Sequence, residues 1–433
     1  MEHSITLSWL EEQSKLNYNK NSSITLNFVL FLTKISPMPK SILTIILILG
    51  SAISPLFAQN ESKEMLLMDE SIQIEATDAV NQLYNFKFDS AEAKFREFRV
   101  RYPEHPMPHF LMGLSTWWKI LPNTDVTKHD ETFLAYMDSS LTLAEKLYEE
   151  DKKNYEAIFF LAAAHGFKAE LHGYRKNYRK ATFSGSKALS FLQDISENDL
   201  SPEFLYGNAI LNYYSQWIKE EYPLLKPILV FFPKGDKELG ISQLKEVASF
   251  AFYTRTEAQY QLMKIHYLED KYKEGMPTAR YLATTFPDNG YFERYYALFA
   301  FKTGHMIECE YASKNVLTKL EAGMPGYDEI GGRYAGFFLG YINQHLYNNK
   351  EKAKEYYKKA VYYAEKIDAT KQGYYLYSLS ALAKFAHDEG DHLTAHKYYK
   401  TIKKNTGKSY KDSEMYREAK KNSKNRYKKQ WED

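Results

Sequence analysis

Cysteine is almost absent from this chain, since Cys309 is the only one among 433 residues. A single thiol excludes an intramolecular disulfide and a zinc site built from several cysteines. Charge of one sign is also scarce, with 57 basic and 55 acidic residues and a net charge of +2. We therefore expect no nucleic-acid partner for the body of the protein, because such binding needs an excess of basic residues.

Short catalytic and metal-binding motifs are missing as well. The chain contains no His-Glu-x-x-His, no Gly-x-Ser-x-Gly and no phosphate-binding loop. His105 with His109, and His165 with His172, are pairs that lack a third ligand, and structural zinc wants four. We expect no catalytic residue, no cofactor and no metal. An enzyme whose site is assembled from distant residues stays an alternative, because such a site leaves no sequence motif.

Long apolar runs are absent except near the amino terminus. Met38-Pro-Lys-Ser precedes an apolar run at 42–49, and small residues then lead to Ala58, which is followed by Gln59. This order is typical of a secretory signal peptide, and the run is short for a membrane-spanning helix of about 20 residues. The ending also resembles signal peptides of exported proteins in gram-negative bacteria. We expect cleavage after Ala58 and a soluble mature protein in the periplasm or cell envelope.

Residues 1–37 do not suit a leader, because they carry Glu2, Glu11 and Glu12. Our hypothesis is that translation begins at Met38, so that 1–37 is a doubtful upstream extension. The alternative is an uncleaved anchor with a short inner tail. Residues 59–70 then form a linker, and the absence of cysteine near Ala58 excludes a lipoprotein anchor.

A half-motif recurs along the rest of the chain: a small residue is followed four positions later by an aromatic one. A small residue lets two helix backbones approach, and the ring fills the space above it. The clearest copies are Phe88-x-x-Ala91-x-x-x-Phe95-x-x-Phe98, Ala353-x-x-x-Tyr357-x-x-Ala360 and Ala395-x-x-x-Tyr399-x-x-Ile402. Each copy predicts a tightly packed helix pair.

This spacing resembles the second half of the tetratricopeptide repeat (TPR), a helix–turn–helix unit of about 34 residues. The resemblance implies an all-α fold, a right-handed α-solenoid of about eight pairs over 71–403, in which each unit contacts its neighbours. We expect Ala353 and Ala395 to be buried at helix contacts. Cys309 should be buried at the small-residue position of the sixth unit, and the glycines from Gly323 to Gly332 should form a flexible linker.

Two stretches are candidates for partner contact. Trp117 and Trp118 point about 100° apart on a helix, so we expect one of them to reach the surface. The segment 222–233 interrupts the fourth unit with three prolines and many apolar residues, among them Tyr222, Phe231 and Phe232. We expect it either to cover the stack or to form a lip of the binding groove; long exposed apolar runs are rare, which favours the cover.

The carboxyl-terminal residues 404–433 are rich in lysine, including Lys420, Lys421 and Lys424. A solvated helix that caps the stack is one interpretation, because terminal repeats need a polar outer face. Contact with an anionic membrane surface is the other, although acidic residues such as Glu414 and Glu418 dilute the basic charge.

The resemblance implies an adaptor, since tetratricopeptide proteins generally hold peptides or helices in a concave groove. We expect an exported, non-enzymatic scaffold that binds a protein or peptide partner in the cell envelope. The alternative is a helical carrier of an apolar ligand, with the segment 222–233 lining its pocket. Partner identity and oligomeric state leave no mark in this sequence.

Overall fold

The computed structural model of the protein describes residues 65–193, 202–221, 234–407, 410–411 and 413–423. Residues 1–37, the predicted signal peptide 38–58 and the apolar segment 222–233 lie outside these residues. Within them the chain forms seventeen α-helices and no strand. The all-α prediction is therefore confirmed.

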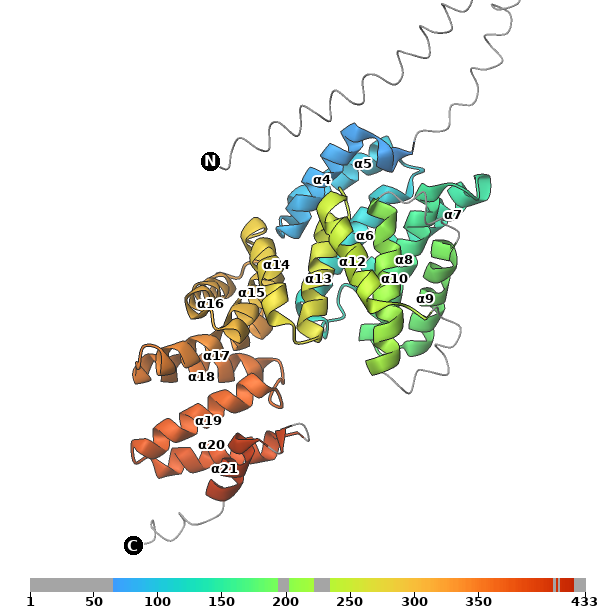
Figure 1. Ribbon diagram of the computed structural model, residues 1–433. Helices are drawn as coiled ribbons and strands as arrows, with labels where there is room; N and C mark the ends of the chain where they lie inside the picture. Colours follow the sequence, from blue (N-terminus) through green and yellow to red (C-terminus); the bar gives the residue numbers. More distant parts are fainter. Residues whose placement is uncertain (1–64, 194–201, 222–233, 408–409, 412, 424–433) are drawn as a thin grey trace, which may run out of the picture. The chain divides into compact units, whose positions relative to one another are not determined.

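Sixteen of these helices form eight consecutive helix pairs (Figure 1). The first four pairs are α4 (Glu70–Tyr84) with α5 (Phe88–Arg101), α6 (Pro106–Ile120) with α7 (Asp130–Glu150), α8 (Tyr155–Tyr174) with α9 (Tyr178–Gln193), and α10 (Pro202–Glu221) with α12 (Lys237–Phe250). Two short 3₁₀ helices, η1 (Leu66–Met68) and η2 (Leu121–Asn123), precede α4 and follow α6.

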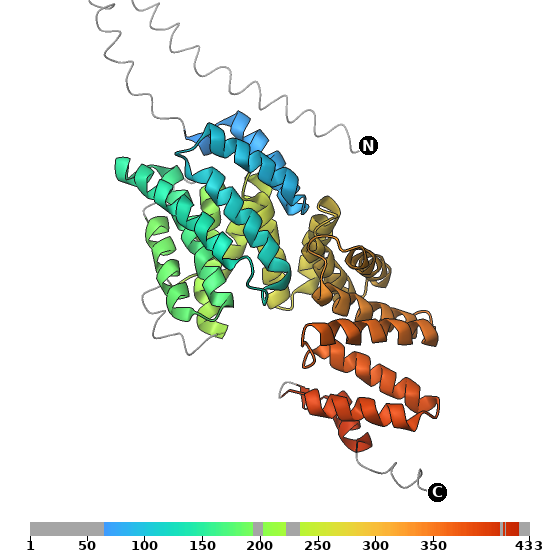
Figure 2. The ribbon, with the colours of Figure 1, turned by 180° about the vertical axis from the view of Figure 1, so that it is seen from behind.

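The remaining pairs are α13 (Arg255–Leu268) with α14 (Tyr272–Thr285), α15 (Gly290–Thr303) with α16 (Met306–Glu321), α17 (Glu329–His345) with α18 (Lys350–Lys366), and α19 (Gly373–Asp388) with α20 (His392–Asn405). Consecutive helices pack against each other, and α17 to α21 follow one another as successive layers (Figures 1 and 2). The pairs form an α-solenoid, as predicted. No helix in the described part of the chain is both long and apolar enough to cross a bilayer.

The small residues of the half-motif lie where the helices come closest. Ala353, Ala360 and Ala395 are buried, and Cys309 is fully buried at the corresponding place in α16. On the facing helix α17, a Cβ at Gly336 would lie 2.7 Å from the backbone nitrogen of Ala360. Small residues on both helices therefore permit this close contact, which confirms the predicted packing positions.

The turns inside six of the eight pairs share a backbone conformation that most side chains avoid. Positive φ angles occur at Phe86, Lys176, Asp270, Gly304, Asn348 and Gly390, each in the turn between the two helices of a pair. A left-handed residue ends the first helix and reverses the chain within a few residues. Gly304 and Gly390 mark two of these turns in the sequence, whereas the other four residues are not glycine and give no such signal.

The expected glycine linker is only partly a linker. Gly331 and Gly332 belong to the first turn of α17, and a Cβ at Gly332 would lie 2.7 Å from the Tyr363 ring and from the Leu320 side chain. The prediction of a flexible segment through Gly332 is therefore wrong, because these glycines serve helix packing.

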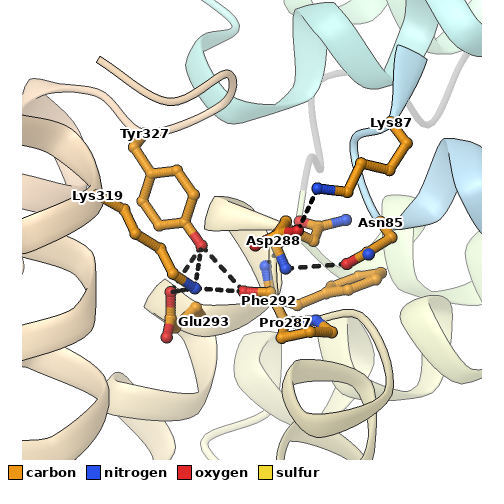
Figure 3. A network of polar contacts seen from close by, with 9 residues as sticks. Asn85, Lys87, Pro287, Asp288, Phe292, Glu293, Lys319 and Tyr327 are labelled. Atoms are coloured by element: carbon orange, nitrogen blue, oxygen red, sulfur yellow. Dashed lines mark hydrogen bonds and ion pairs between the residues drawn. The ribbon is translucent and has the colours of Figure 1, made fainter. Parts of the chain in front are cut away.

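The first pair also contacts the middle of the chain, which an array with contacts between neighbours alone would not allow. Asn289 donates from Nδ2 to the Tyr84 carbonyl over 2.7 Å, and the Asp288 backbone N–H donates to Asn85 Oδ1 over 2.9 Å. Lys87 pairs with Asp288 at 2.6 Å (Figure 3). We call these contacts the clasp. It joins the turn of the first pair to the turn between α14 and α15.

The loop after α16 extends the clasp. A Cβ at Gly326, which has a φ of +78°, would lie 2.0 Å from the Phe86 ring, so glycine is required there on both counts. Tyr327 donates to Glu293 over 2.7 Å, and Lys319 pairs with Glu293 at 3.2 Å (Figure 3). The expectation that each unit contacts only its neighbours is therefore wrong for the first pair.

Candidate functional site

The first helices of the last four pairs each carry a half-buried tyrosine. They are Tyr267 on α13, Tyr295 on α15, Tyr334 on α17 and Tyr374 on α19. The rings of Tyr267 and Tyr295 lie 5.2 Å apart, and those of Tyr334 and Tyr374 lie 4.9 Å apart, both edge to face. We call these four residues the tyrosine ladder. Its members come from alternate helices of the chain.

The ladder offers neutral hydroxyl groups next to aromatic surface. Burial raises the pKa of Tyr267, Tyr295 and Tyr374 above the ordinary value of 10. A tyrosine hydroxyl is protonated at neutral pH and can donate a hydrogen bond. Half-buried tyrosines combine apolar contact area with a polar tip, which is why this residue is common at binding interfaces.

Arginine accompanies the ladder on α15 and α17. Arg294 is buried and donates from Nη1 to the Pro122 carbonyl over 3.1 Å, while the same atom lies 3.6 Å from Asp328 Oδ1. Its guanidinium lies 5.1 Å from the centre of the Tyr291 ring. Arg333 is buried beside Tyr334, with its guanidinium carbon 5.1 Å from that ring centre. The ladder is therefore flanked by two cations.

The first helices of the first five pairs enclose a second feature, an apolar cavity of about 70 Å³. Its lining comes from α4, α6, α8, α10 and α13, and it includes Val80, Phe110, Leu114, Phe160, Phe167 and Tyr206. Phe167 and Tyr206 are only half-buried. Such a cavity has room for a few non-hydrogen atoms of an apolar group.

One carboxyl group borders this cavity. Glu257 accepts a hydrogen bond of 2.9 Å from the Tyr84 hydroxyl, and burial raises its pKa to about 7. Nearby, Lys264 lies 2.8 Å from Glu170 and is surrounded by the rings of Tyr174, Tyr214 and Tyr260 at 5.7 to 6.0 Å. Burial disfavours its charge, but Glu170 and the tyrosines raise the pKa of Lys264.

The structure corrects the expectation for the paired tryptophans, because both are fully buried. Trp117 packs against Phe133 and Phe167, and Trp118 packs against Tyr84, Tyr260 and Phe292 at 5.2 Å each. Helix α6 is covered on both sides, by its own neighbours and by the first and fifth pairs. Directions 100° apart therefore both point into the core, and neither indole reaches the surface.

The other three candidates, Tyr222, Phe231 and Phe232, lie outside the described residues. Across the ranges that are described, no three His, Cys, Asp or Glu side chains are close enough to hold a metal ion. His105 lies 3.2 Å from Glu156, and burial lowers the pKa of His165 to about 4. These histidines are thus neutral or paired within the fold.

Sequence reasoning missed the ladder, although a weak signal exists. Tyr295, Tyr334 and Tyr374 follow one another at intervals of 39 and 40 residues (334 − 295 and 374 − 334). That interval is close to one helix pair, so an aromatic residue recurs in successive first helices. With 37 tyrosines in the chain, the recurrence does not stand out until the helices are placed.

Comparison with known proteins does not assign this arrangement to a family. The sequence matches no family model and no curated protein.

Proposed function

We propose that this protein is an exported, non-enzymatic scaffold that binds a protein or peptide partner in the cell envelope, as the resemblance to tetratricopeptide proteins implies. The observation that carries the proposal is the tyrosine ladder. Four half-buried rings on successive first helices, in two edge-to-face pairs, provide aromatic contact area next to hydroxyl groups. Side chains of this type supply much of the binding free energy at protein interfaces.

The export part of the proposal depends on residues 38–58, whose sequence is typical of a signal peptide. A mature chain that begins at Gln59 and is recovered from the periplasm or envelope would support it. Peripheral membrane contact through the basic residues 404–433 stays a secondary proposal. Within that segment, α21 (Glu414–Asn422) buries Met415 and Ala419, so part of it covers the last pair.

Affinity purification from envelope fractions tests the scaffold function. We expect the full chain to retrieve a protein, and a Tyr334→Ser and Tyr374→Ser double variant to lose most of it. The matched control is Tyr311→Ser with Tyr362→Ser, which changes exposed tyrosines on the second helices α16 and α18. Equal recovery by both double variants, with both folded, would remove the ladder from the binding surface.

A carrier of an apolar ligand is the second candidate, and the cavity beside Glu257 is the observation that favours it. Its volume of about 70 Å³ suits a small group or a chain end rather than a whole lipid. The same purification separates the two functions. Recovery of an apolar small molecule without any protein would favour the carrier.

A further inference from the structure

Arg333 is a buried cation without a counter-ion. Only 7% of the residue is exposed, and its Nε has no hydrogen-bond partner. None of the acidic side chains that the structure describes forms an ion pair with it. By contrast, Lys264 pairs with Glu170 at 2.8 Å and Lys319 with Glu293 at 3.2 Å. Burying an unpaired charge is strongly unfavourable, so the position of Arg333 needs another explanation.

The surroundings of Arg333 are rich in positive charge and hydrogen-bond donors. Arg294 lies close enough to act on Arg333 electrostatically, as do Tyr374 and Tyr410. Burial, together with the charge of Arg294, lowers the pKa of Arg333 from its ordinary value. Asp328, the acidic N-cap of the same helix, lies 3.6 Å from Arg294 and accepts from the Gly331 N–H over 3.0 Å. The described surroundings of the Arg333 guanidinium therefore contain more positive than negative charge.

The amino-terminal end of α19 adds further donors. Its N-cap residue, Gln372, gives no side-chain hydrogen bond to the first turn, whereas Asp328, Asn349 and Asp391 cap their helices. The Tyr410 hydroxyl lies 2.8 Å from the position that a Cβ at Gly373 would take. Free N–H groups at a helix start attract anions, and a neighbouring guanidinium strengthens the attraction.

We propose that Arg333, with Arg294 and the start of α19, binds an oxyanion that the partner carries, a carboxylate or a phosphate. This inference rests on the proposed scaffold function, because the site adjoins Tyr334 and Tyr374 of the ladder. It specifies an acidic partner whose anionic group neutralises Arg333 while its apolar parts contact the rings. A guanidinium offers a planar fork of donors that matches both kinds of oxyanion.

The test needs no partner. Thermal unfolding of the full chain is followed in sodium acetate and in sodium phosphate, each against sodium chloride of equal ionic strength. We expect at least one oxyanion to raise the melting temperature of the wild type in a saturable way. Arg333→Met should lose this increase, and Arg333→Lys should keep only part of it. Arg99→Met, which changes an exposed arginine on α5, should keep it fully. The oxyanion that gives the larger rise in melting temperature indicates whether the site prefers a carboxylate or a phosphate.

A purely structural arginine would behave differently. In chloride alone, Arg333→Met should melt no lower than the wild type, because it removes an unpaired buried charge and keeps the aliphatic stem. Equal oxyanion responses in the wild type and Arg333→Met, or no saturable response in the wild type, would overturn the proposal.

The outcomes also separate this inference from the scaffold function. If the wild type retrieves a protein but shows no oxyanion response, the anion site fails alone. If the response is present and depends on Arg333 while no protein is retrieved, the site stands and the scaffold function fails.

Discussion

Glu257 is a carboxyl group held among apolar side chains, with the Tyr84 hydroxyl as its hydrogen-bond donor at 2.9 Å. Burial raises its pKa from 4.5 to about 7, so the folded protein binds this proton more tightly than the unfolded chain does. Stability from this group is present below about pH 4.5. It is lost as pH rises towards 7, because the charged carboxylate is then buried.

We therefore predict that the free energy of unfolding falls by roughly 3 kcal/mol between pH 4.5 and pH 7 on account of Glu257, at about 1.4 kcal/mol per pKa unit. Glu257→Gln should lack this part of the pH dependence. Urea unfolding of the wild type and of Glu257→Gln across this pH range measures the difference between their free energies of unfolding. The contributions of titrating histidines are the same in both proteins and cancel in that difference. Parallel curves for the two proteins would show that Glu257 stays charged throughout.

At the scale of elements, the pairing of helices is set by small residues opposite rings. Ala353 is fully buried in α18 and Ala395 is buried in α20, so neither place has room for a larger side chain. We predict that Ala353→Leu or Ala395→Leu costs about 1–3 kcal/mol through overpacking. Lys358→Leu, at an exposed position of α18, should change stability little. Denaturant unfolding compares the three, and equal midpoints would place the close contacts elsewhere.

The helix pairs could be predicted from sequence because their packing is local. Ala353 and Tyr357 lie within one helix, and Cys309 takes the position of Ala353 in another helix. The spacing of residues within a helix therefore predicts the burial of both small residues. The environment of Trp118 could not be predicted in this way. Its neighbours Tyr260 and Phe292 come from pairs far along the chain, and burial of the second indole depends on them.

The binding candidates follow the same division. The tyrosine ladder and Arg333 become evident only when first helices from separate pairs lie side by side. No local sequence pattern distinguishes Tyr334 from the other tyrosines of the chain. The residues next to Arg333 in sequence likewise do not reveal that its guanidinium lacks a counter-ion. Sequence thus predicts the framework of the solenoid, whereas the binding candidates depend on contacts between units.

For the whole molecule, the clasp distinguishes this chain from an array stabilised by neighbouring units alone. Asn289 is fully buried and has two roles: its Oδ1 accepts from the Phe292 N–H at the start of α15, and its Nδ2 donates to the Tyr84 carbonyl of the first pair. Asn349 caps α18 by the same type of bond, to the Lys352 N–H, in a more exposed setting. Comparing variants of the two asparagines therefore separates the effect of capping a helix from the effect of the bond to the first pair.

We predict that Asn289→Ala destabilises the fold by about 1–3 kcal/mol more than Asn349→Ala, because it also leaves the buried Tyr84 carbonyl without its donor. Hydrogen exchange gives the sharper measurement. Amides of α4 and α5 should exchange faster in Asn289→Ala than in the wild type, while Asn349→Ala should leave them unchanged. If α4 and α5 exchange at equal rates in both variants, the Asn289 bond does not hold the first pair. Its remaining contacts with distant helices, such as that of Tyr84 with Glu257 and that of Lys87 with Asp288, would then suffice for the cooperativity of the solenoid.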